Sequence, residues 1–252
     1  MIDIIVVNYR TPDDLMAFVD SYRETRTDEC ELTVVDVDPL VSVGYKNIPG
    51  TLITMKENKG YAFAVNYAAA SAGGDVLGIF NADIKLKPGT IKDCVTALRS
   101  RSDWGVLGPL QHDSKGLVTH GGILGTNEHP HQRGWHQRYS NEYRDIREDA
   151  VVIMGSAYFI KKKVWDELTS CPIYQECFPG AFGAFLPTFL YYEETGCSYH
   201  AAAHGYKNVY YGVAECIHEW HGSIHKHGDK AAFKDSQKVF RDFCDKHSIL
   251  HD

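Results

Sequence analysis

The fold prediction starts from the segment Val76-Leu77-Gly78-Ile79-Phe80-Asn81-Ala82-Asp83. Its first five residues form a continuous apolar run, which is typical of a strand buried on both faces of a sheet. Asparagine and aspartate follow this run directly, and Pro88-Gly89 then marks the start of a helix. The segment therefore predicts a buried strand that ends in polar side chains and leads into a helix.

The same alternation of strand and helix extends over the first half of the chain. Apolar runs predict strands at residues 4–7, 32–37, 51–55, 76–80 and 104–107. Helices are predicted at about residues 11–23, 60–72 and 90–100. This order predicts right-handed crossovers and an α/β fold, with a mostly parallel sheet covered by helices on both faces.

The second half of the chain is less regular. Residues 112–149 are polar and rich in glycine and histidine, which predicts long loops, and another loop is predicted at residues 174–187. Strands are expected at residues 151–160 and 209–211, and helices at residues 163–168, 193–204 and 230–247. No segment has the composition of a linker, so we expect a single domain over residues 1–252.

The composition excludes several classes of protein. The chain has 252 residues and a net charge of −7, so no basic surplus indicates nucleic-acid binding. No apolar run approaches the roughly 18–20 residues of a membrane span, and the first residues lack the pattern of a secretory signal. Seven scattered cysteines form no CxxC motif, which favours reduced thiols and a cytoplasmic location, with a disulfide between Cys171 and Cys177 left open.

Two nucleotide-binding fingerprints are missing. No GxGxxG motif follows the first predicted strand, and the chain contains no GxxxxGK[ST] motif. These absences argue against a dinucleotide-dependent oxidoreductase and a P-loop NTPase.

Polar residues follow four consecutive predicted strands. They are Asn8-Tyr9-Arg10, Asp36-Val37-Asp38, Asn58-Lys59-Gly60 and Asn81-Ala82-Asp83. Ligands of parallel α/β sheets bind beyond the carboxyl ends of the strands, so these residues could form one polar rim. Asparagine, aspartate and glycine also favour turns, which is the alternative for any single position. The four groups together favour a binding site.

These segments carry a family resemblance. Residues 58–66 and 76–89 closely resemble the GT-A glycosyltransferases of family 2, in the subgroup that includes bacterial rhamnosyltransferases. The resemblance begins at residues 4–9, continues at residues 154–157 and 191–194, and reaches residues 218–223. It implies a single GT-A-like, Rossmann-like domain. About residues 1–110 would bind the sugar nucleotide, and about residues 111–252 would bind the acceptor.

The resemblance also implies a divalent metal. Asn81-Ala82-Asp83 lies where the family has its DxD motif, so Asp83 is the expected metal ligand. His218 or His221 is the expected second ligand, and an imidazole favours Mn²⁺ over Mg²⁺. The competing interpretation of this histidine-rich segment is a zinc site, with or without Cys216 as one of its ligands.

The nucleotide pocket follows from the same resemblance. Asp36 is expected to bind the base or the ribose, and Asn8 and Tyr9 are expected to line the same pocket. Lys59 and Gly60 are expected to lie along the nucleotide. Asn58, Asn81 and Ala82 complete the set of residues predicted to bind the nucleotide sugar. UDP is the default nucleotide, and dTDP is the alternative.

The pair Glu193-Glu194 matches the family's acidic pair. Its second member, Glu194, is the expected general base, and Glu193 is the substitute. The implied reaction is an inverting transfer of a hexose-type sugar to a hydroxyl group of a glycan, a protein or a lipid-linked acceptor. A nucleotidyltransferase, or a non-catalytic sugar- or zinc-binding protein, is the alternative. His200 and His204 share one face of a predicted helix without an HExxH motif and are interpreted as structural or surface residues.

Overall fold

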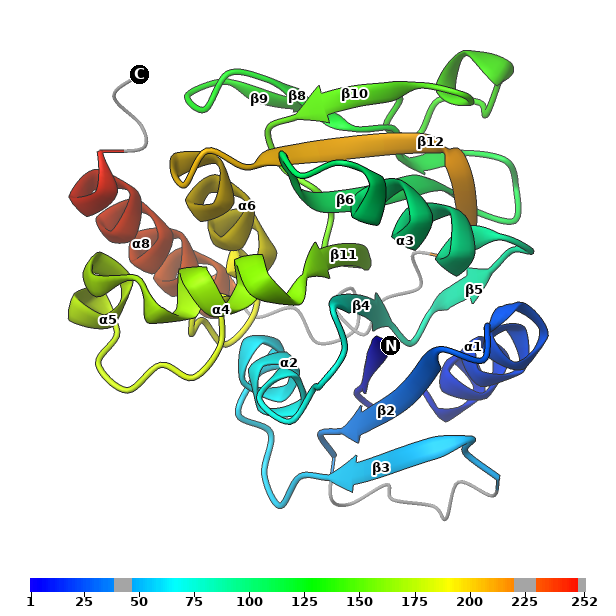
Figure 1. Cartoon of the computed structure of the whole chain (residues 1–252), viewed down its shortest axis with the longest axis horizontal. Helices are drawn as coiled ribbons and strands as arrows, with labels where there is room; N and C mark the ends of the chain where they lie inside the picture. Colours follow the sequence, from blue (N-terminus) through cyan, green and yellow to red (C-terminus); the bar gives the residue numbers. More distant parts are fainter. Residues whose placement is uncertain (39–46, 220–229, 249–252) are drawn as a thin grey trace.

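The computed structural model describes residues 1–38, 47–219 and 230–248 (Figure 1). In this part of the chain a large sheet runs through the middle of the molecule, and helices lie on both of its faces. The helices are α1 (Pro12–Thr25), α2 (Tyr61–Ala69), α3 (Thr90–Ser100), the 3₁₀ helix η1 (Asn141–Tyr143), α4 (Lys162–Ser170), α5 (Pro172–Cys177), α6 (Glu193–Ala203) and α8 (Lys230–His247). The strands are β1 (Ile2–Asn8), β2 (Cys30–Asp36), β3 (Gly50–Thr54), β4 (Val76–Asn81), β5 (Ile84–Leu86), β6 (Trp104–His112), β7 (Val118–His120), β8 (Ile123–Gly125), β9 (Pro130–Gln132), β10 (Arg147–Ala150), β11 (Ala157–Lys161) and β12 (Lys207–His218).

The strand order of the large sheet is β10-β12-β6-β11-β4-β1-β2-β3, with β5 paired to β12 and β7 paired to β6. β3, β2, β1 and β4 are parallel neighbours, as the alternation in the first half of the sequence predicts. β12 is parallel to β6, whereas β11 lies antiparallel between β4 and β6. The predicted α/β class with helices on both faces is confirmed, and the second half of the chain makes the sheet more mixed than predicted.

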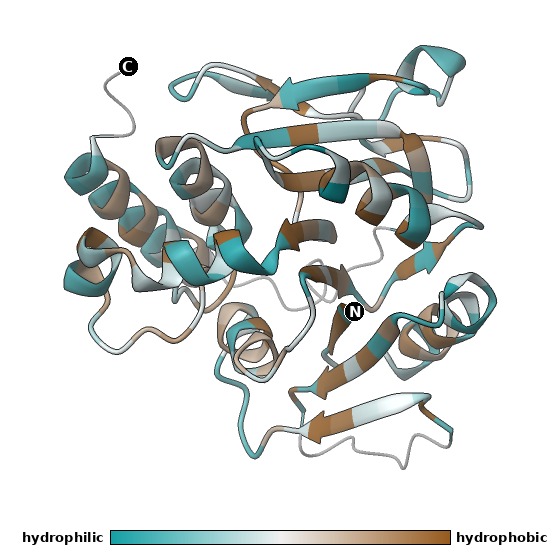
Figure 2. Ribbon diagram, viewed as in Figure 1, coloured by the Kyte–Doolittle hydropathy of each residue, from teal (hydrophilic) through white to brown (hydrophobic). Residues whose placement is uncertain are grey.

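Two apolar layers cover the faces of the sheet. Ile4 and Val6 of β1 face the layer that contains α1 and α3. Ile5 and Val7 face the opposite layer, which contains α2, α4 and α6. Figure 2 shows the matching pattern of hydrophobic central strands and helices with polar outer faces. Since neighbouring residues of a strand point to opposite faces, burial on both sides explains the continuous apolar runs of the sequence.

The element predictions fail mainly between residues 112 and 161. The predicted loop at residues 112–149 contains β7, β8, β9, η1 and the start of β10. These elements have only three or four residues each, too few for a recognisable hydrophobic period. The strand predicted at residues 151–160 is also wrong in its first part, because β11 begins at Ala157. The loop predicted from residue 174 begins inside α5.

The turn before α2 depends on glycine. Gly60 has a φ of 95°, a backbone conformation that residues other than glycine rarely adopt. A Cβ atom at this position would lie 2.4 Å from the carbonyl oxygen of Phe189. The next residue, Tyr61, donates its backbone N–H to that same oxygen at 2.9 Å. Gly60 therefore allows the loop before α6 to pack directly on the start of α2.

We predict that Gly60→Ala destabilises the protein more than Gly116→Ala does. Both glycines have positive φ, but a Cβ at Gly116 has no heavy atom within 4 Å. Each substitution places a side chain on a positive-φ backbone, which costs about 1–3 kcal/mol. Only Gly60→Ala adds overpacking, about 1–3 kcal/mol. Denaturant unfolding measures the two losses of unfolding free energy, and equal losses would contradict the close packing at Gly60.

Candidate active site

Three parallel strands bring their polar carboxyl ends together. In the sheet register Asn8 pairs with Asp36, and Val7 pairs with Asn81. The Asn8 side-chain amide donates to Oδ1 of Asp36 at 3.3 Å, and the Thr11 hydroxyl donates to Oδ1 of Asn8 at 2.9 Å. Asn8 and Asp36 are each 1% exposed. The structure thus brings these two sequence-predicted residues into one buried polar contact, next to the end of β4.

The segment after β1 is fixed by a second carboxylate. Arg10 has a left-handed backbone with φ 59°, and its Nε donates to the buried carboxylate of Asp38. Its guanidinium carbon also lies 5.0 Å from the centre of the Tyr9 ring. This cation–π contact holds the Tyr9 ring next to the buried contact between Asn8 and Asp36.

The side-chain contacts in the group Asn58-Lys59-Gly60 are with residues nearby in the sequence. Oδ1 of Asn58 accepts the backbone N–H of Gly60 at 2.9 Å, which closes the turn into α2. The Lys59 ammonium lies 3.0 Å from Glu57 and 5.1 Å from the centre of the Phe63 ring. Lys59 thus holds surface contacts, and a phosphate group would have to compete with Glu57 for it.

Asp83 and His218 meet at the end of β12. The strand pairing places His218 opposite Ile84, directly after Asp83. Nε2 of His218 lies 3.5 Å from Oδ1 of Asp83, and both side chains are at most 12% exposed. A carboxylate oxygen and an imidazole nitrogen at this separation fit a metal such as Mn²⁺. The other predicted ligand, His221, lies outside the described residues.

Cys216 does not join this pair. It is fully buried in the apolar cluster of α1 and α3. Burial raises the pKa of its thiol, and the nearby Glu215 raises it further. This environment disfavours a metal-binding thiolate, so the alternative zinc site of Cys216 with His218 is not supported.

The acidic pair begins α6 behind a strained turn. Tyr191 and Tyr192 have φ values of 73° and 68°, an uncommon conformation for bulky residues that is often found at functional sites. Glu193 is 4% exposed, and its Oε2 accepts the hydroxyl of Thr188 at 3.4 Å. Glu194 is partly buried. The turn thus presents two adjacent carboxyl groups in different environments.

Burial raises the pKa of both glutamates, by different amounts. The pKa of Glu193 lies well above its ordinary value, first because of burial and then because of the neighbouring charge of Glu194. Burial also raises the pKa of Glu194, whereas hydrogen bonds from backbone groups of Glu194, Gly155 and Thr195 lower it. Since the stronger shift falls on Glu193, the pair favours a neutral Glu193 beside an ionised Glu194.

The short segment Gly155-Ser156 connects this acidic pair to the end of β4. The backbone N–H of Asn81 donates to the Ser156 carbonyl at 3.0 Å. A Cβ atom at Gly155 would lie 2.9 Å from Cγ and Cδ of Glu194. The Tyr61 hydroxyl donates to the Gly155 carbonyl at 3.3 Å. The motif that contains Asp83 and the motif that contains Glu194 therefore flank the same two residues.

The pKa of the Tyr61 hydroxyl is affected by the carboxyl groups of both motifs. Burial raises its pKa well above the ordinary value, and the charges of Glu193, Glu194 and Asp83 raise it further, in that order. All three carboxyl groups thus act on one phenol. Tyr61 was part of the family resemblance, but no property of the sequence marked it as a site residue.

Sequence reasoning also missed a buried polar layer behind the site. The Ser156 hydroxyl donates to Oε1 of Gln111 at 2.6 Å, and Gln111 pairs with His120 across β6 and β7. His120 is fully buried, and burial lowers its pKa to about 3, with smaller effects of Arg133 and His218. Both residues lie in or next to the segment predicted as loop, where no periodicity marked them.

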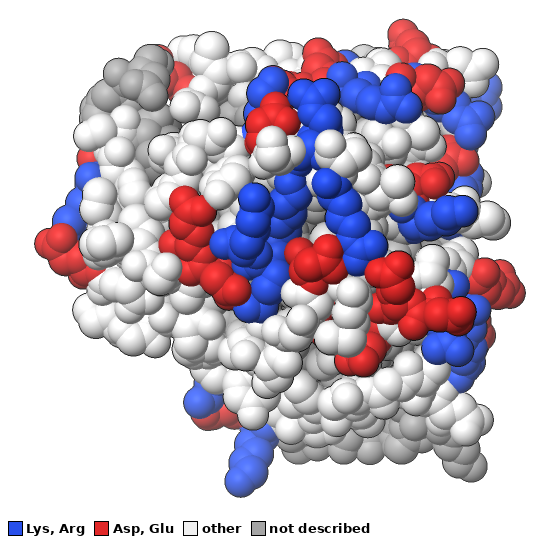
Figure 3. Space-filling view, viewed as in Figure 1, with Lys and Arg blue, Asp and Glu red and all other residues white. Residues whose placement is uncertain are grey.

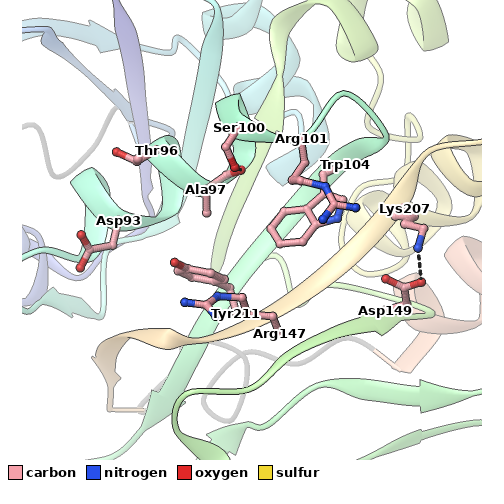
Figure 4. Close-up of a pocket in the computed structure, with 10 residues that line it drawn as sticks. All are labelled: Asp93, Thr96, Ala97, Ser100, Arg101, Trp104, Arg147, Asp149, Lys207 and Tyr211. Atoms are coloured by element: carbon pink, nitrogen blue, oxygen red, sulfur yellow. Dashed lines mark hydrogen bonds and ion pairs between the residues drawn. The ribbon is translucent and has the colours of Figure 1, made fainter.

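A surface pocket lies elsewhere, between α3, the start of β6, β10 and β12 (Figure 4). Lys207 and Asp149 form an ion pair at one end of it, at 2.8 Å (Figure 4). Figure 3 shows lysine and arginine side chains gathered on one face of the molecule, with acidic side chains among them. Trp104 lies at the opposite end of β6 from Gln111, so this pocket is separate from the space around Asp83 and Glu194.

Comparison with known proteins identifies the family and the fold. The model of the family described as "Glycosyl transferase family 2" matches residues 3–168. GalNAc-T7 with UDP, GalNAc and Mn²⁺ has a TM-score of 0.70 and 14% identity, over 98% of this chain and 50% of its own. The mannosyltransferase PcManGT from Pyrobaculum calidifontis, with GDP-Man and Mn²⁺, has a TM-score of 0.59 and 16% identity, over 99% of this chain and 69% of its own. The S. aureus TarS 1-349 structure in complex with UDP-GlcNAc has a TM-score of 0.61 and 12% identity, over 97% of this chain and 66% of its own.

The described fold is that of a GT-A glycosyltransferase. The chain belongs to glycosyl transferase family 2. It spans about half of the length of the GalNAc-T7 chain that it matches. None of the curated proteins compared with it matches in sequence. Among the described residues, no helix combines the length and the apolar character that crossing a membrane requires.

We predict that the thermal stability of Glu193→Gln decreases less than that of the wild type as pH rises. The folded-state pKa of Glu193 is raised above its ordinary 4.5. Its protonation therefore stabilises the fold below pH 4.5, and this contribution is lost as pH rises through the folded-state pKa. The Tm advantage of Glu193→Gln over wild type should grow between pH 5 and pH 8. Glu24→Gln, at an exposed position of α1, is the control. A difference that is constant with pH would contradict the shift.

Proposed function

We propose that this protein transfers a hexose-type sugar from a nucleoside diphosphate sugar to an acceptor hydroxyl, with inversion at the anomeric carbon. The observation that carries the proposal is the Gly155-Ser156 segment, which joins the end of β4 to Glu194. An anchor for the donor diphosphate and a base for the acceptor have to face one reacting carbon, and this segment supports that arrangement.

The donor half of the site would be built by the strand ends. Asp36 and Asn8, held together in their buried contact, are proposed to bind the base or ribose, with Tyr9 at the rim. Asn58, Lys59, Gly60, Asn81 and Ala82 are proposed to border the nucleotide sugar. Residues 1–110 would thus bind the donor, and residues 111–252 would supply the acceptor side.

Asp83 and His218 are the residues proposed to hold a divalent cation, with Mn²⁺ preferred over Mg²⁺ because of the imidazole. When bound, such a cation neutralises charge on the departing diphosphate. Two of the similar structures, GalNAc-T7 and PcManGT, are described with Mn²⁺, which supports this cofactor. His221 stays a proposed additional ligand.

Glu194 is proposed as the general base. Its carboxylate takes the proton of the acceptor hydroxyl while that oxygen forms a bond to the anomeric carbon. The bond from the anomeric carbon to the diphosphate oxygen breaks in the same step, and the diphosphate leaves with the electron pair. Glu193, kept neutral by burial and held to Thr188, positions the start of α6 instead.

The donor nucleotide is proposed to be UDP, with dTDP as the alternative. The descriptions of GalNAc-T7 and TarS name UDP or UDP-GlcNAc, whereas that of PcManGT names GDP-Man. A thermal-shift panel of UDP, dTDP and GDP with Mn²⁺ distinguishes them, since a ligand at 100 times its Kd stabilises by about 2.7 kcal/mol. Release of nucleoside diphosphate, rather than pyrophosphate, on addition of the acceptor glycan, protein or lipid separates sugar transfer from nucleotidyl transfer.

We predict that Asp83→Ala weakens Mn²⁺-dependent UDP binding by at least about 10–100-fold, since that much is already lost when only a hydrogen-bond partner of a metal ligand is removed. Asp28→Ala is the matched control, because Asp28 is exposed and lies just before the opposite end of β2. Calorimetric titration of UDP with and without EDTA measures the effect. Wild-type affinity of Asp83→Ala in Mn²⁺, or full wild-type transfer in EDTA, would contradict the metal role.

We predict that Glu194→Gln keeps donor affinity and loses roughly 10²–10⁴ in turnover, the usual contribution of a general base. Glu193→Gln should keep most of its turnover, because an amide resembles the neutral acid. Activity of the wild type should fall as pH drops through the raised pKa of Glu194, since the base must be ionised. If Glu193→Gln is the inactive variant, the two roles are reversed.

A further inference from the structure

A second group of ligand-type side chains lies away from the proposed sugar-transfer site. Cys171 is at the junction of α4 and α5, His200 is near the end of α6, and His247 is the last residue of α8. One ligand atom of each side chain lies within 4.8 Å of the others. Among the described residues this is the one such group of three.

The spacing of these atoms suits a tetrahedral metal. Sγ of Cys171 and Nε2 of His247 are 3.8 Å apart. Around a zinc ion with Zn–S near 2.3 Å and Zn–N near 2.0–2.1 Å, a sulfur and a nitrogen ligand are separated by roughly 3.6 Å. The remaining separations are at most 4.8 Å, so side-chain movements of about an ångström or less per residue would complete the geometry.

The imidazole of His200 is the most deeply buried member of the group. His200 is fully buried, and neither of its ring nitrogens has a hydrogen-bond partner among the described residues. A buried polar group without a partner is costly, so such an atom calls for an explanation. A metal ion bound to one of these nitrogens would supply the missing partner.

We propose that Cys171, His200 and His247 form a zinc-binding site. A thiolate with two imidazoles favours Zn²⁺ over the oxygen-preferring Mg²⁺ and Mn²⁺. Water takes the fourth position, since His247 is partly exposed. His204 is not included, because only Cys171, His200 and His247 form the group whose ligand atoms all lie within 4.8 Å of one another.

The proposed zinc site would fasten α8 to the body of the protein. Phe240 of α8 packs on Tyr192 with ring centres 5.1 Å apart, directly before the acidic pair that starts α6. His200 lies near the other end of that same helix. Zinc would thus hold the carboxyl end of α6 to α8 and to the junction of α4 and α5. This role is independent of the proposed sugar transfer.

The sequence interpretation of His200 as a structural or surface residue did not foresee this group. The three ligands come from separate helices, far apart in the chain, and no short motif contains two of them. His200 and His204 share a helix face, as expected, but the structure directs His200 toward Cys171 and His247.

The test measures zinc binding by the untagged full-length chain. Protein stripped of metal is titrated with Zn²⁺ against a chromophoric chelator, in an Asp83→Ala background that removes the proposed donor-site ligand. We expect one tight equivalent per chain and a rise in Tm. Cys171→Ala and His247→Ala should each weaken zinc binding by more than about 100-fold, beyond the roughly 10–100-fold loss from a missing hydrogen-bond partner of a ligand.

Cys244→Ala is the matched control, because Cys244 is buried in the same apolar cluster but is not one of the three. It should bind zinc like the parent protein. Replacing zinc by Co²⁺ gives a second readout, since a thiolate ligand adds a charge-transfer band in the near ultraviolet that Cys171→Ala must remove. Absence of a tight equivalent in the parent, or equal binding by Cys171→Ala and Cys244→Ala, would overturn the proposal whatever the enzymatic activity.

Discussion

The arrangement of the candidate active site depends on one backbone contact, the hydrogen bond from the N–H of Asn81 to the carbonyl of Ser156. It continues the antiparallel pairing of β11 with β4 by one residue beyond the Phe80–Ala157 pair. Because Gly155 is the next residue and lacks a side chain, the carboxyl group of Glu194 can lie against it. The strand that positions Asp83 and the helix that presents Glu194 are thereby placed around one space.

Close approach at glycine recurs on the other side of this space. Gly60 lets the backbone of Phe189 contact the start of α2, and the chain then turns through the two left-handed tyrosines into α6. The Tyr61 hydroxyl closes the arrangement by donating to Gly155. Strained backbone persists only where the surroundings fix it, and here the packing of α8 on Tyr192 supplies part of that restraint.

The sequence alone predicted the α/β class and the polar strand ends well, because buried parallel strands leave continuous apolar runs and their register brings Asn8 and Asp36 together. Recognition of Asp83 and the Glu193-Glu194 pair needed the family resemblance, since either motif alone could be a turn or a helix start. Contacts between distant segments could not be predicted. Gln111 and His120 lay in short strands without periodicity, and Tyr61 looked like any aromatic residue at a helix start.

The central claim is that Asp83 and Glu194 face one reacting centre. A crystal structure of the protein with UDP and Mn²⁺ tests it directly, because the anomalous signal of manganese locates the ion independently of the refined model. We expect the ion between the Asp83 carboxylate and the diphosphate, with the Glu194 carboxylate facing the open side of the β-phosphate. An ion bound away from Asp83, or a nucleotide bound away from the ends of β1, β2 and β4, would contradict the account.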